Sequence, residues 1–400
     1  SKTIVCVTTS QIPSLTANSI QVMKACQALA QLGHQVHLLA PGRENAPWEA
    51  LANHYGLQTR FQVEWLPAFP SLKRYDFSLA AVRRAKALAA DLLYVWPAQA
   101  AVFGLLFGLP VLLEMHGLPE GKFGPLVFRL FLRLRSNGRY GVAGNKRLLP
   151  ITHALAGILE QQFGHQFAPG EVVVAPNGVD LERYADLPSP TEARRALGLP
   201  EAFTIGYTGH LYAGRGMELM LELARRFSQL SFLWVGGRPE DVARWQQRLA
   251  EQQIANITLI GFVENNRLPL YQAAAEILLM PYERQIAGSG GGNSAAYASP
   301  MKMFEYLACG RAILSSDLPV IREVLDETNA LLCPPEDIEA WSRALADLIS
   351  APLKRERLAQ RALETAQRYT WLARAQKALD GFMVERSIPS VERRSGDRIA

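Results

Sequence analysis

Lys302 and Glu305 are three residues apart, a spacing that would put both side chains on one face of a helix. The helix dipole favours an anion in the first turn, so a lysine there suggests a bound phosphate. A carboxylate one turn further along could accept two hydrogen bonds from the diol of a ribose. The alternative is a solvated ion pair on an ordinary helix, and the spacing alone does not exclude it.

The segment "SPMKMFEYLACGRAIL" (299–314) predicts the helix that would carry this pair. Ser299 is a favoured N-cap, Pro300 suits the first helical position, and Gly310 suits the residue after the last turn. We therefore expect a two-turn helix from Pro300 to about Cys309, after the predicted strand "EILLMPY". In doubly wound sheets ligands bind where such helices begin, and the free N–H groups there suit phosphate.

The segment "YTGHLYAGRGMELML" (207–221) offers a second candidate anion site. A predicted strand ends near Gly209, a glycine-bearing loop follows, and a helix begins near Gly216. Arg215 lies just before that helix, where a guanidinium can hold phosphate through two hydrogen bonds. The segment has neither the G-K-[ST] of a phosphate-binding loop nor the dinucleotide fingerprint, so ordinary surface structure remains the alternative.

Two segments in the first half of the chain would face the same cleft. "GLPVLLEMHG" (108–117) ends a predicted strand near His116, which could bind a sugar, move a proton, or simply be satisfied in a turn. "SQIPSLTANS" (10–19) follows the first predicted strand. Its Ser14, Thr16 and Asn18 could bind ligand or cap the next helix.

Two runs of alternating strands and helices must position these residues. The first run begins at "TIVCVTT" (3–9) and continues to "EVVVAPNG" (171–178); after a looser stretch, the alternation restarts at "FTIGYTG" (203–209). This pattern predicts an α/β protein with two Rossmann-like, doubly wound domains. We place the first domain at 1–182, the second at 183–365, a last helix at 366–383, and a polar tail that we expect to be frayed at 384–400.

The composition is that of a soluble globular protein, with 49% hydrophobic and 20% charged residues among 400 and a mean hydropathy of +0.01. A net charge of +5 favours anionic ligands or an anionic membrane surface but does not by itself indicate nucleic acid, and we expect no nucleic-acid partner. The four cysteines are expected to be buried free thiols. With no recognisable signal peptide or membrane span, we expect a cytoplasmic protein.

The sequence lacks the motifs of several catalytic mechanisms. There is no Asp-x-Asp that would hold a diphosphate through a metal, no H-E-x-x-H and no G-x-S-x-G. We therefore expect neither a bound metal nor a cofactor.

Taken together, these motifs resemble the large retaining glycosyltransferase family 4, also described as glycosyl transferases group 1, which has the GT-B fold. "SPMKMFEYLACGRAIL" resembles its nucleotide-sugar helix, and "YTGHLYAGRG", "PNGVDLERY", "WVGG" and "LIGFV" resemble its other landmarks in matching order, to about residue 383. The resemblance implies two domains that face each other across a cleft. It also implies a final helix around Trp371 that crosses back to the first domain.

The resemblance also implies roles for individual residues. Glu305 would hold the ribose hydroxyls, Arg215 would replace the phosphate-binding lysine of the family, and His116 would contact the donor sugar. With Lys302, these form the expected catalytic set. The other expected donor-binding residues contact the base or the diphosphate through their backbone, or are glycines that leave room for the ligand to approach. They are Gly209, His210, Gly236, Gly237, Phe262, Tyr297, Ser299, Pro300 and Met301.

Two positions depart from the pattern of the family. Tyr297 stands where the family often has the first of two glutamates seven residues apart, which usually contacts the transferred sugar. His210 stands where the family usually has an arginine. The charge of the diphosphate would then rest on Arg215, Lys302 and the helix terminus.

The function implied is metal-independent transfer of a hexose from a UDP or GDP sugar to a hydroxyl group, with retention at the anomeric carbon, in glycolipid, polysaccharide or other glycoconjugate synthesis. A sugar-nucleotide 2-epimerase and a non-catalytic nucleotide-sugar-binding protein are the alternatives. The segment 121–149 mixes large apolar residues with Arg129, Arg133, Arg135, Arg139, Lys146 and Arg147. It could lie on anionic lipid and serve a lipid-linked acceptor, on the inner face of the membrane, or pack on its own sheet with a solvated basic edge.

Overall fold

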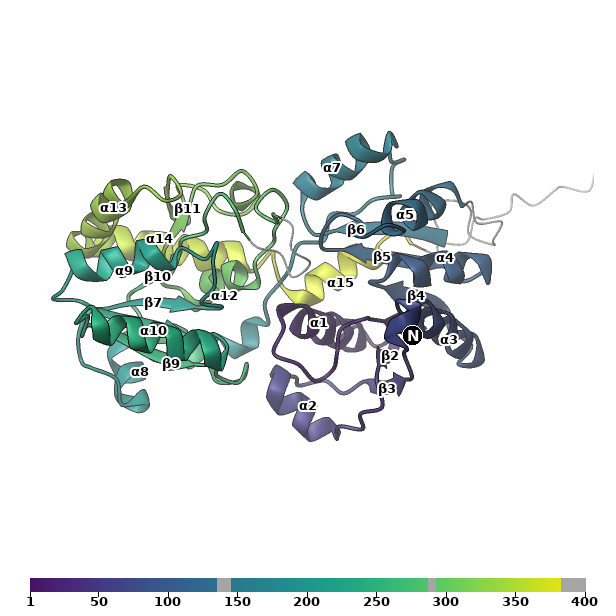
Figure 1. The fold of residues 1–400 in the computed structure, drawn as a ribbon, viewed down its shortest axis with the longest axis horizontal. Coiled ribbons are helices and arrows are strands. Elements are labelled where there is room, and N and C mark those ends of the chain that lie inside the picture. Colours follow the sequence, from purple (N-terminus) through teal and green to yellow (C-terminus); the bar gives the residue numbers. More distant parts are fainter. Residues whose placement is uncertain (135–144, 287–292, 383–400) are drawn as a thin grey trace, which may run out of the picture.

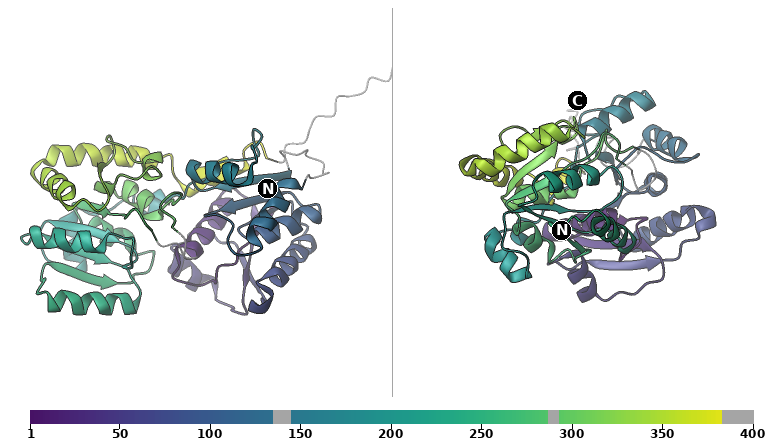
Figure 2. Two further views of the ribbon diagram at one scale, coloured as in Figure 1. Left: turned by 45° about the horizontal axis from the view of Figure 1, so that its top comes forward. Right: turned by 60° about the vertical axis from the view of Figure 1, so that its left-hand side comes forward.

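Two α/β domains make up the computed structural model, which describes residues 1–134, 145–286 and 293–382 (Figure 1). Each domain contains a six-stranded sheet, and helices cover both faces of each sheet (Figures 1 and 2). The strand pairs are parallel throughout these residues. The prediction of two doubly wound α/β domains is confirmed. The expected tail at 384–400 lies outside the described residues.

The N-terminal sheet has the strand order β3-β2-β1-β4-β5-β6. Its strands are β1 (Thr3–Val7), β2 (Gln35–Pro41), β3 (Gln62–Leu66), β4 (Leu92–Val95), β5 (Val111–Met115) and β6 (Lys146–Pro150). Its helices are α1 (Ala17–Gln31), α2 (Trp48–Tyr55), α3 (Tyr75–Ala87), α4 (Ala98–Leu106), α5 (Gly124–Arg133) and α7 (His153–Phe163), with short 3-10 helices η1 (Pro70–Leu72) and η2 (Leu181–Arg183).

The C-terminal sheet has the strand order β12-β11-β10-β7-β8-β9. Its strands are β7 (Thr204–Thr208), β8 (Ser231–Val235), β9 (Ile257–Gly261), β10 (Ile277–Met280), β11 (Ala312–Ser316) and β12 (Leu331–Cys333). Its helices are α8 (Pro190–Leu197), α9 (Met217–Arg226), α10 (Pro239–Glu251), α11 (Leu268–Ala273), α12 (Met301–Cys309), α13 (Ile338–Ser350) and α14 (Pro352–Ala366), with η3 (Ile321–Glu323).

The central strands are buried on both faces, which explains their nearly continuous apolar sequences. Of the four edge strands, β3, β9 and β12 are only partly buried, whereas β6 is buried. The segment 171–178, predicted as a strand, forms only an isolated bridge beside β6. The N–H groups of Val173 and Ala175 donate to the carbonyls of Leu148 and Pro150, but Pro150 has no N–H group with which to continue the ladder.

The last described helix, α15 (Trp371–Leu379), lies beside α1 in the N-terminal domain, although it follows α14 of the C-terminal domain in sequence (Figure 1). Trp371, Ala375 and Ala378 are buried in the same core cluster as residues of β1 and α1. Arg147 of β6 donates hydrogen bonds to the carbonyls of Ala378 (2.8 Å) and Asp380 (2.7 Å). The helix therefore completes the core of the N-terminal domain.

None of the helices within the described ranges is both long enough and apolar enough to cross a membrane.

Candidate active site

Helix α12 begins one residue later than predicted, and Pro300 is its N-cap. The hydroxyl of Ser299 accepts a hydrogen bond from the N–H of Asn177 (3.1 Å), and the Ser299 carbonyl accepts one from the Asn177 side chain (2.6 Å). The prediction that Ser299 caps the helix was wrong, because this residue binds the segment that joins the two domains. The first N–H groups of α12, at Met301 and Lys302, have no carbonyl within the helix to bind, and such groups suit phosphate.

Lys302 lies among aromatic rings rather than beside a carboxylate. Its ammonium is 4.0 Å from the ring centre of Tyr207 and 5.6 Å from that of Tyr282. Within the described residues it forms no ion pair, so the solvated pair with Glu305 that the sequence left open does not form. Burial, and then the positive charge of Arg215, lower the pKa of Lys302 well below its usual value. A bound anion would favour the charged form of this lysine.

Arg215 is held next to the same aromatic group. Its guanidinium donates a hydrogen bond to the Tyr212 hydroxyl (3.0 Å) and lies 5.0 Å from the Tyr212 ring and 5.1 Å from the Tyr282 ring. Its Nε is buried and has no hydrogen-bond partner in the described part of the chain. The following Gly216 has a φ of +71°, and a Cβ there would lie 2.0 Å from the Pro281 carbonyl. Only glycine therefore lets this loop bring Arg215 against Tyr282.

His210 adds a third nitrogen-bearing side chain to this group. Its ring stacks on Tyr212 with centroids 5.0 Å apart. Burial, and then the charges of Arg215 and Lys302, lower the pKa of His210 to about 4. The ring is therefore neutral at neutral pH. The loop between β7 and α9 and the start of α12 together form a cationic cluster (Arg215 and Lys302), with neutral His210 beside it and without a paired carboxylate among the described residues.

Glu305 is oriented by a buried amide. Gln272 donates from Nε2 to the Glu305 carboxylate (3.0 Å) and to the Thr208 hydroxyl (3.2 Å), and its own oxygen accepts from the Tyr184 hydroxyl (2.8 Å). This network holds one carboxylate oxygen of Glu305. The other accepts no hydrogen bond within the described ranges, so it is free to bind a hydroxyl group.

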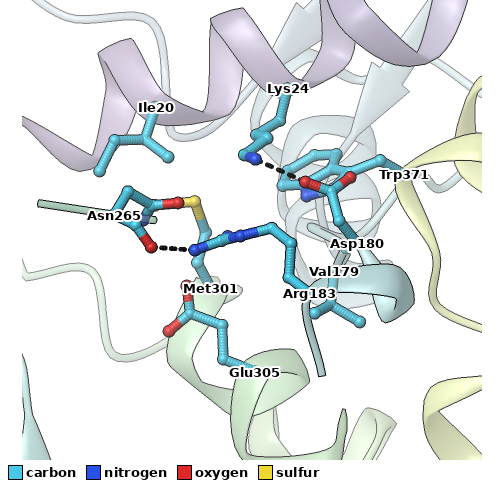
Figure 3. A pocket seen from close by; sticks show the side chains of 10 residues that line it. Ile20, Lys24, Val179, Asp180, Arg183, Asn265, Met301, Glu305 and Trp371 are labelled. Atoms are coloured by element: carbon cyan, nitrogen blue, oxygen red, sulfur yellow. Dashed lines mark hydrogen bonds and ion pairs between the residues drawn. The ribbon is translucent and has the colours of Figure 1, made fainter. Parts of the chain in front are cut away.

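Glu305 lines a pocket between the domains (Figure 3). The pocket has about 240 Å³ of non-atom space, part of it open to solvent. Lys24 of α1 reaches it from the N-terminal domain and donates hydrogen bonds to Asp180 and to the Gly56 carbonyl (2.6 Å). Burial lowers the pKa of Lys24 to about 8, although Asp180 opposes this shift. Lys24 and Asp180 from the N-terminal domain and Glu305 from the C-terminal domain give this narrow pocket a charged lining.

His116 lies at the end of β5, on the N-terminal side of the cleft. Its Nε2 is 2.6 Å from Oε1 of Glu114, a carboxylate that is 1% exposed. The side chain of His116 is partly exposed. The structure therefore places this histidine next to a buried negative charge.

Tyr297 and Phe262, two predicted donor-binding residues of the C-terminal domain, contact the N-terminal domain. A Cβ at Gly117 would lie 3.3 Å from the Tyr297 ring, and the Tyr297 carbonyl accepts a hydrogen bond from the Thr152 hydroxyl (3.1 Å). Phe262 is 44% exposed and stacks on His54, with centroids 6.2 Å apart. The base contact assigned to the backbone near Phe262 stays a prediction.

The predicted donor-site glycines are packed against other parts of the protein. Gly236 has a φ of +116°, and a Cβ there would lie 2.3 Å from the Gly209 carbonyl. A Cβ at Gly237 would lie 2.7 Å from the Leu211 side chain. Protein atoms, rather than a ligand, thus make the close approach that was expected at Gly236 and Gly237.

The segment with Ser14, Thr16 and Asn18 caps α1. The Thr16 hydroxyl accepts a hydrogen bond from the N–H of Ser19 (3.3 Å) and is 2.9 Å from the Ser14 hydroxyl. Asn18 is exposed in the first turn. Thr16 therefore caps α1, which is one of the two alternatives. Acceptor binding by these residues stays a prediction.

The basic segment 121–149 has an exposed part on α5 and a buried part in β6. Helix α5 buries Phe128 and Phe131, while Leu126 on another side of the helix is 65% exposed. Lys146 and Arg147 are buried: Lys146 donates to carbonyls at the end of α5, and Arg147 binds α15. The expectation that these two residues form a basic surface was wrong. Of the other four cations expected on this surface, Arg129 and Arg133 are exposed on α5, and Arg135 and Arg139 lie outside the described residues.

The sequence analysis missed the residues that hold the site together. Glu114 interrupts an apolar strand, and Lys24 and Gln272 interrupt the buried faces of α1 and α11, so a charged or amide residue in an apolar pattern was the available signal. Among the described residues, no group of three or more His, Cys, Asp or Glu side chains is placed to hold a metal ion.

Two family models match most of the chain. The model described as Glycosyltransferase Family 4 matches residues 19–183, and the model described as Glycosyl transferases group 1 matches residues 202–351. The first match lies in the N-terminal domain and the second in the C-terminal domain.

Among curated proteins, the phosphatidyl-myo-inositol mannosyltransferase of Mycolicibacterium smegmatis is 24% identical over 371 residues, covering 88% of this chain and 85% of that protein. The D-inositol 3-phosphate glycosyltransferase of Kineococcus radiotolerans is 25% identical over 230 residues, 54% of this chain and 52% of that protein. Among solved structures, HepE of Anabaena in complex with UDP has a TM-score of 0.68 at 16% identity and covers 94% of this chain and 97% of its own. This likeness shows that the two domains have the GT-B fold.

Proposed function

Since the chain belongs to the family 4 glycosyltransferases, with a group 1 domain as its C-terminal half, we propose that it transfers a hexose from a UDP or GDP sugar to a hydroxyl acceptor, with retention at the anomeric carbon and without a metal ion. The observation that carries this proposal is the cationic cluster. Lys302 is the second residue of α12, and Arg215 lies against the same Tyr282 ring; neither has a carboxylate partner in the described ranges.

The geometry supports one placement of the donor. The diphosphate would lie between Arg215, Lys302 and the start of α12, and the ribose would lie against the free oxygen of Glu305. HepE of Anabaena, which shares the fold, has been solved with UDP and with UDP-glucose. The sugar would then project toward His116 across the cleft.

The proposed reaction follows from these charges. The acceptor hydroxyl attacks the anomeric carbon on the side from which the diphosphate leaves, and the departing phosphate oxygen takes the proton of that hydroxyl. Negative charge grows on the leaving diphosphate, where Arg215, Lys302 and the N–H groups of α12 stabilise it. Because cationic side chains and backbone donors fill the role that a metal would have, activity should persist in EDTA.

A screen of nucleotide sugars tests the proposal. We expect one UDP or GDP sugar to raise the melting temperature and to release free nucleoside diphosphate when a hydroxyl acceptor is present. Arg215→Ala should lower turnover by about 10²–10³-fold while the circular dichroism spectrum stays unchanged. Binding without release would identify a non-catalytic binding protein, and a changed sugar on an intact nucleotide would identify an epimerase. NMR of the product should show the anomeric configuration of the donor, and inversion would remove retention from the proposal.

We propose further that the acceptor is carried by an anionic membrane, because of the exposed surface of α5. Phe123, Leu126 and Leu130 are 47%, 65% and 44% exposed. The ammonium groups of Lys73 and Lys122 lie 5.3 and 5.9 Å from the Phe123 ring. Exposed Arg129 and Arg133 lie on the same helix. Apolar side chains surrounded by cations suit the interface of an anionic bilayer.

Sedimentation with lipid vesicles tests this second proposal. The protein should bind vesicles that contain phosphatidylglycerol more tightly than vesicles of phosphatidylcholine, and added salt should weaken the binding. Leu126→Asp should weaken it by about tenfold or more. Leu353→Asp is the matched control, because Leu353 is a 79% exposed leucine on α14 of the other domain. Equal binding by both variants would show that α5 is not the membrane contact.

A further inference from the structure

Glu114 contacts four different parts of the N-terminal core through hydrogen bonds and an ion pair. Its Oε1 accepts from Gln21 of α1 and from Nε2 of His116 (2.6 Å), and forms an ion pair with Arg374 of α15 (2.6 Å). Its Oε2 accepts from the Tyr94 hydroxyl of β4. A buried carboxylate with this many donors has little freedom to turn.

The charge of Glu114 decides which nitrogen of His116 carries the proton. Burial alone would raise the pKa of this carboxyl, but Arg374, His116 and Tyr94 hold it at about 2. Glu114 is therefore ionised at neutral pH and can only accept hydrogen bonds. His116 must then donate from Nε2. In the neutral ring, Nδ1 carries the lone pair, and it makes no hydrogen bond with the residues that the structure describes.

Arg374 contacts the same carboxylate oxygen of Glu114 as His116 does. It is buried, donates to the carbonyls of Ala175 (3.1 Å) and Pro176 (2.8 Å), and also donates to the Tyr94 hydroxyl (3.1 Å). This arginine belongs to α15, which reaches the N-terminal domain only after the whole C-terminal domain. The orientation of His116 thus depends on a helix from the far end of the described chain.

We propose that Glu114 is a positioning residue: with Arg374 of α15, it fixes His116 as the Nε2–H tautomer, so that Nδ1 accepts a hydrogen bond from a hydroxyl group in the cleft. We assign this hydroxyl to the donor sugar, and only that assignment rests on the proposed function. The arrangement has the same logic as other sites where a carboxylate sets the tautomer and orientation of a histidine.

NMR of the histidine ring nitrogens tests the proposal directly. In protein labelled with ¹⁵N-histidine, with the His116 signals assigned by their loss in His116→Asn, the wild type should show one neutral tautomer that is protonated at Nε2. In Glu114→Gln the ring should become a mixture of tautomers or the Nδ1–H form. In Tyr94→Phe, which removes a donor from the other oxygen of Glu114, the His116 tautomer should stay as in the wild type.

Two further variants keep the test sharp. Glu114→Gln leaves Arg374 buried without its partner; if that variant does not fold, the pair Glu114→Gln/Arg374→Gln removes both charges and should give the same change of tautomer. Arg147→Gln loosens the end of α15 without touching Glu114, so its His116 signals should not change. An Nδ1–H ring in the wild type, or an unchanged ring in both Glu114 variants, would overturn the proposal.

Turnover separates this inference from the proposed function. Glu114→Gln should lower kcat/KM for the donor by about tenfold, the loss expected for one misplaced hydrogen bond, with little change in nucleoside diphosphate affinity. If no nucleotide sugar is turned over by any variant but the tautomer changes as described, the proposed function fails and the positioning role stands. If turnover and tautomer are both unaffected by Glu114→Gln, the positioning role fails alone.

Discussion

Two cationic side chains lie against one tyrosine ring in the candidate site. Arg215 and Lys302 both contact Tyr282, and the charge of Arg215 adds to burial in lowering the pKa of Lys302. The sequence could predict the two cations, since each stands beside a predicted helix start. It could not predict the rings of Tyr207 and Tyr282, because Tyr207 is in β7, Tyr282 follows β10, and both meet the cations only in the folded chain.

His210 gives a test of this charge arrangement that depends on pH. Its pKa is lowered to about 4 by burial and by Arg215 and Lys302, and a bound diphosphate would offset those charges and raise it. The bound state then carries more protons than the free state between about pH 6.5 and 4, so affinity for UDP or GDP should rise as the pH falls through this range.

Calorimetry with the wild type and His210→Gln checks this prediction and cancels the titration of the diphosphate itself. The ratio of the variant Kd to the wild-type Kd should increase as the pH is lowered from 7 toward 5. A ratio that does not change with pH would mean that the diphosphate does not bind near His210.

Helix α12 holds three of the predicted site residues, Met301, Lys302 and Glu305. Its bounds follow from Pro300 and Gly310 to within one residue, because local capping signals depend only on neighbouring residues. The contact between Ser299 and Asn177 could not be predicted, since it joins residues 122 positions apart. For the same reason the sequence did not show that Glu323 of η3 accepts hydrogen bonds from His153 (2.9 Å) and Ala154 (2.8 Å) at the start of α7.

Asn177→Ala should destabilise the protein by about 1–3 kcal/mol. The substitution removes a hydrogen bond of 2.6 Å and leaves the Ser299 carbonyl buried without its partner. Urea unfolding would measure the change, with Asn18→Ala at an exposed position as the control. A loss no larger than that of the control would show that water replaces the amide at Ser299.

At the scale of the whole molecule, the domains are joined by more than the connecting chain. The Tyr297 carbonyl accepts a hydrogen bond from Thr152, Glu323 binds the start of α7, and α15 packs in the N-terminal core. Periodicity predicted two domains because each domain repeats its own pattern of strands and helices. It could not place α15, whose apolar face is compatible with either domain; only the family resemblance indicated that it crosses back.

Trp371→Ala should destabilise the N-terminal domain by about 3–5 kcal/mol, since this ring is 3% exposed within the core that α15 completes. Unfolding monitored by hydrogen exchange should show the loss in β1 and α1, while the strands of the C-terminal sheet keep their protection. Leu372→Ala, the next residue along and 38% exposed, is the matched control. Equal effects in both domains would mean that they unfold as one unit.

The position of α15 also has a consequence for synthesis on the ribosome. The core of the N-terminal domain includes Trp371 and Ala375, which are translated after the whole C-terminal domain. The N-terminal domain is synthesised first, but part of its apolar core stays uncovered until α15 has been made. The C-terminal domain has all of its strands before that point. The C-terminal domain can therefore finish folding first, and a chaperone that acts late in synthesis would bind the N-terminal domain.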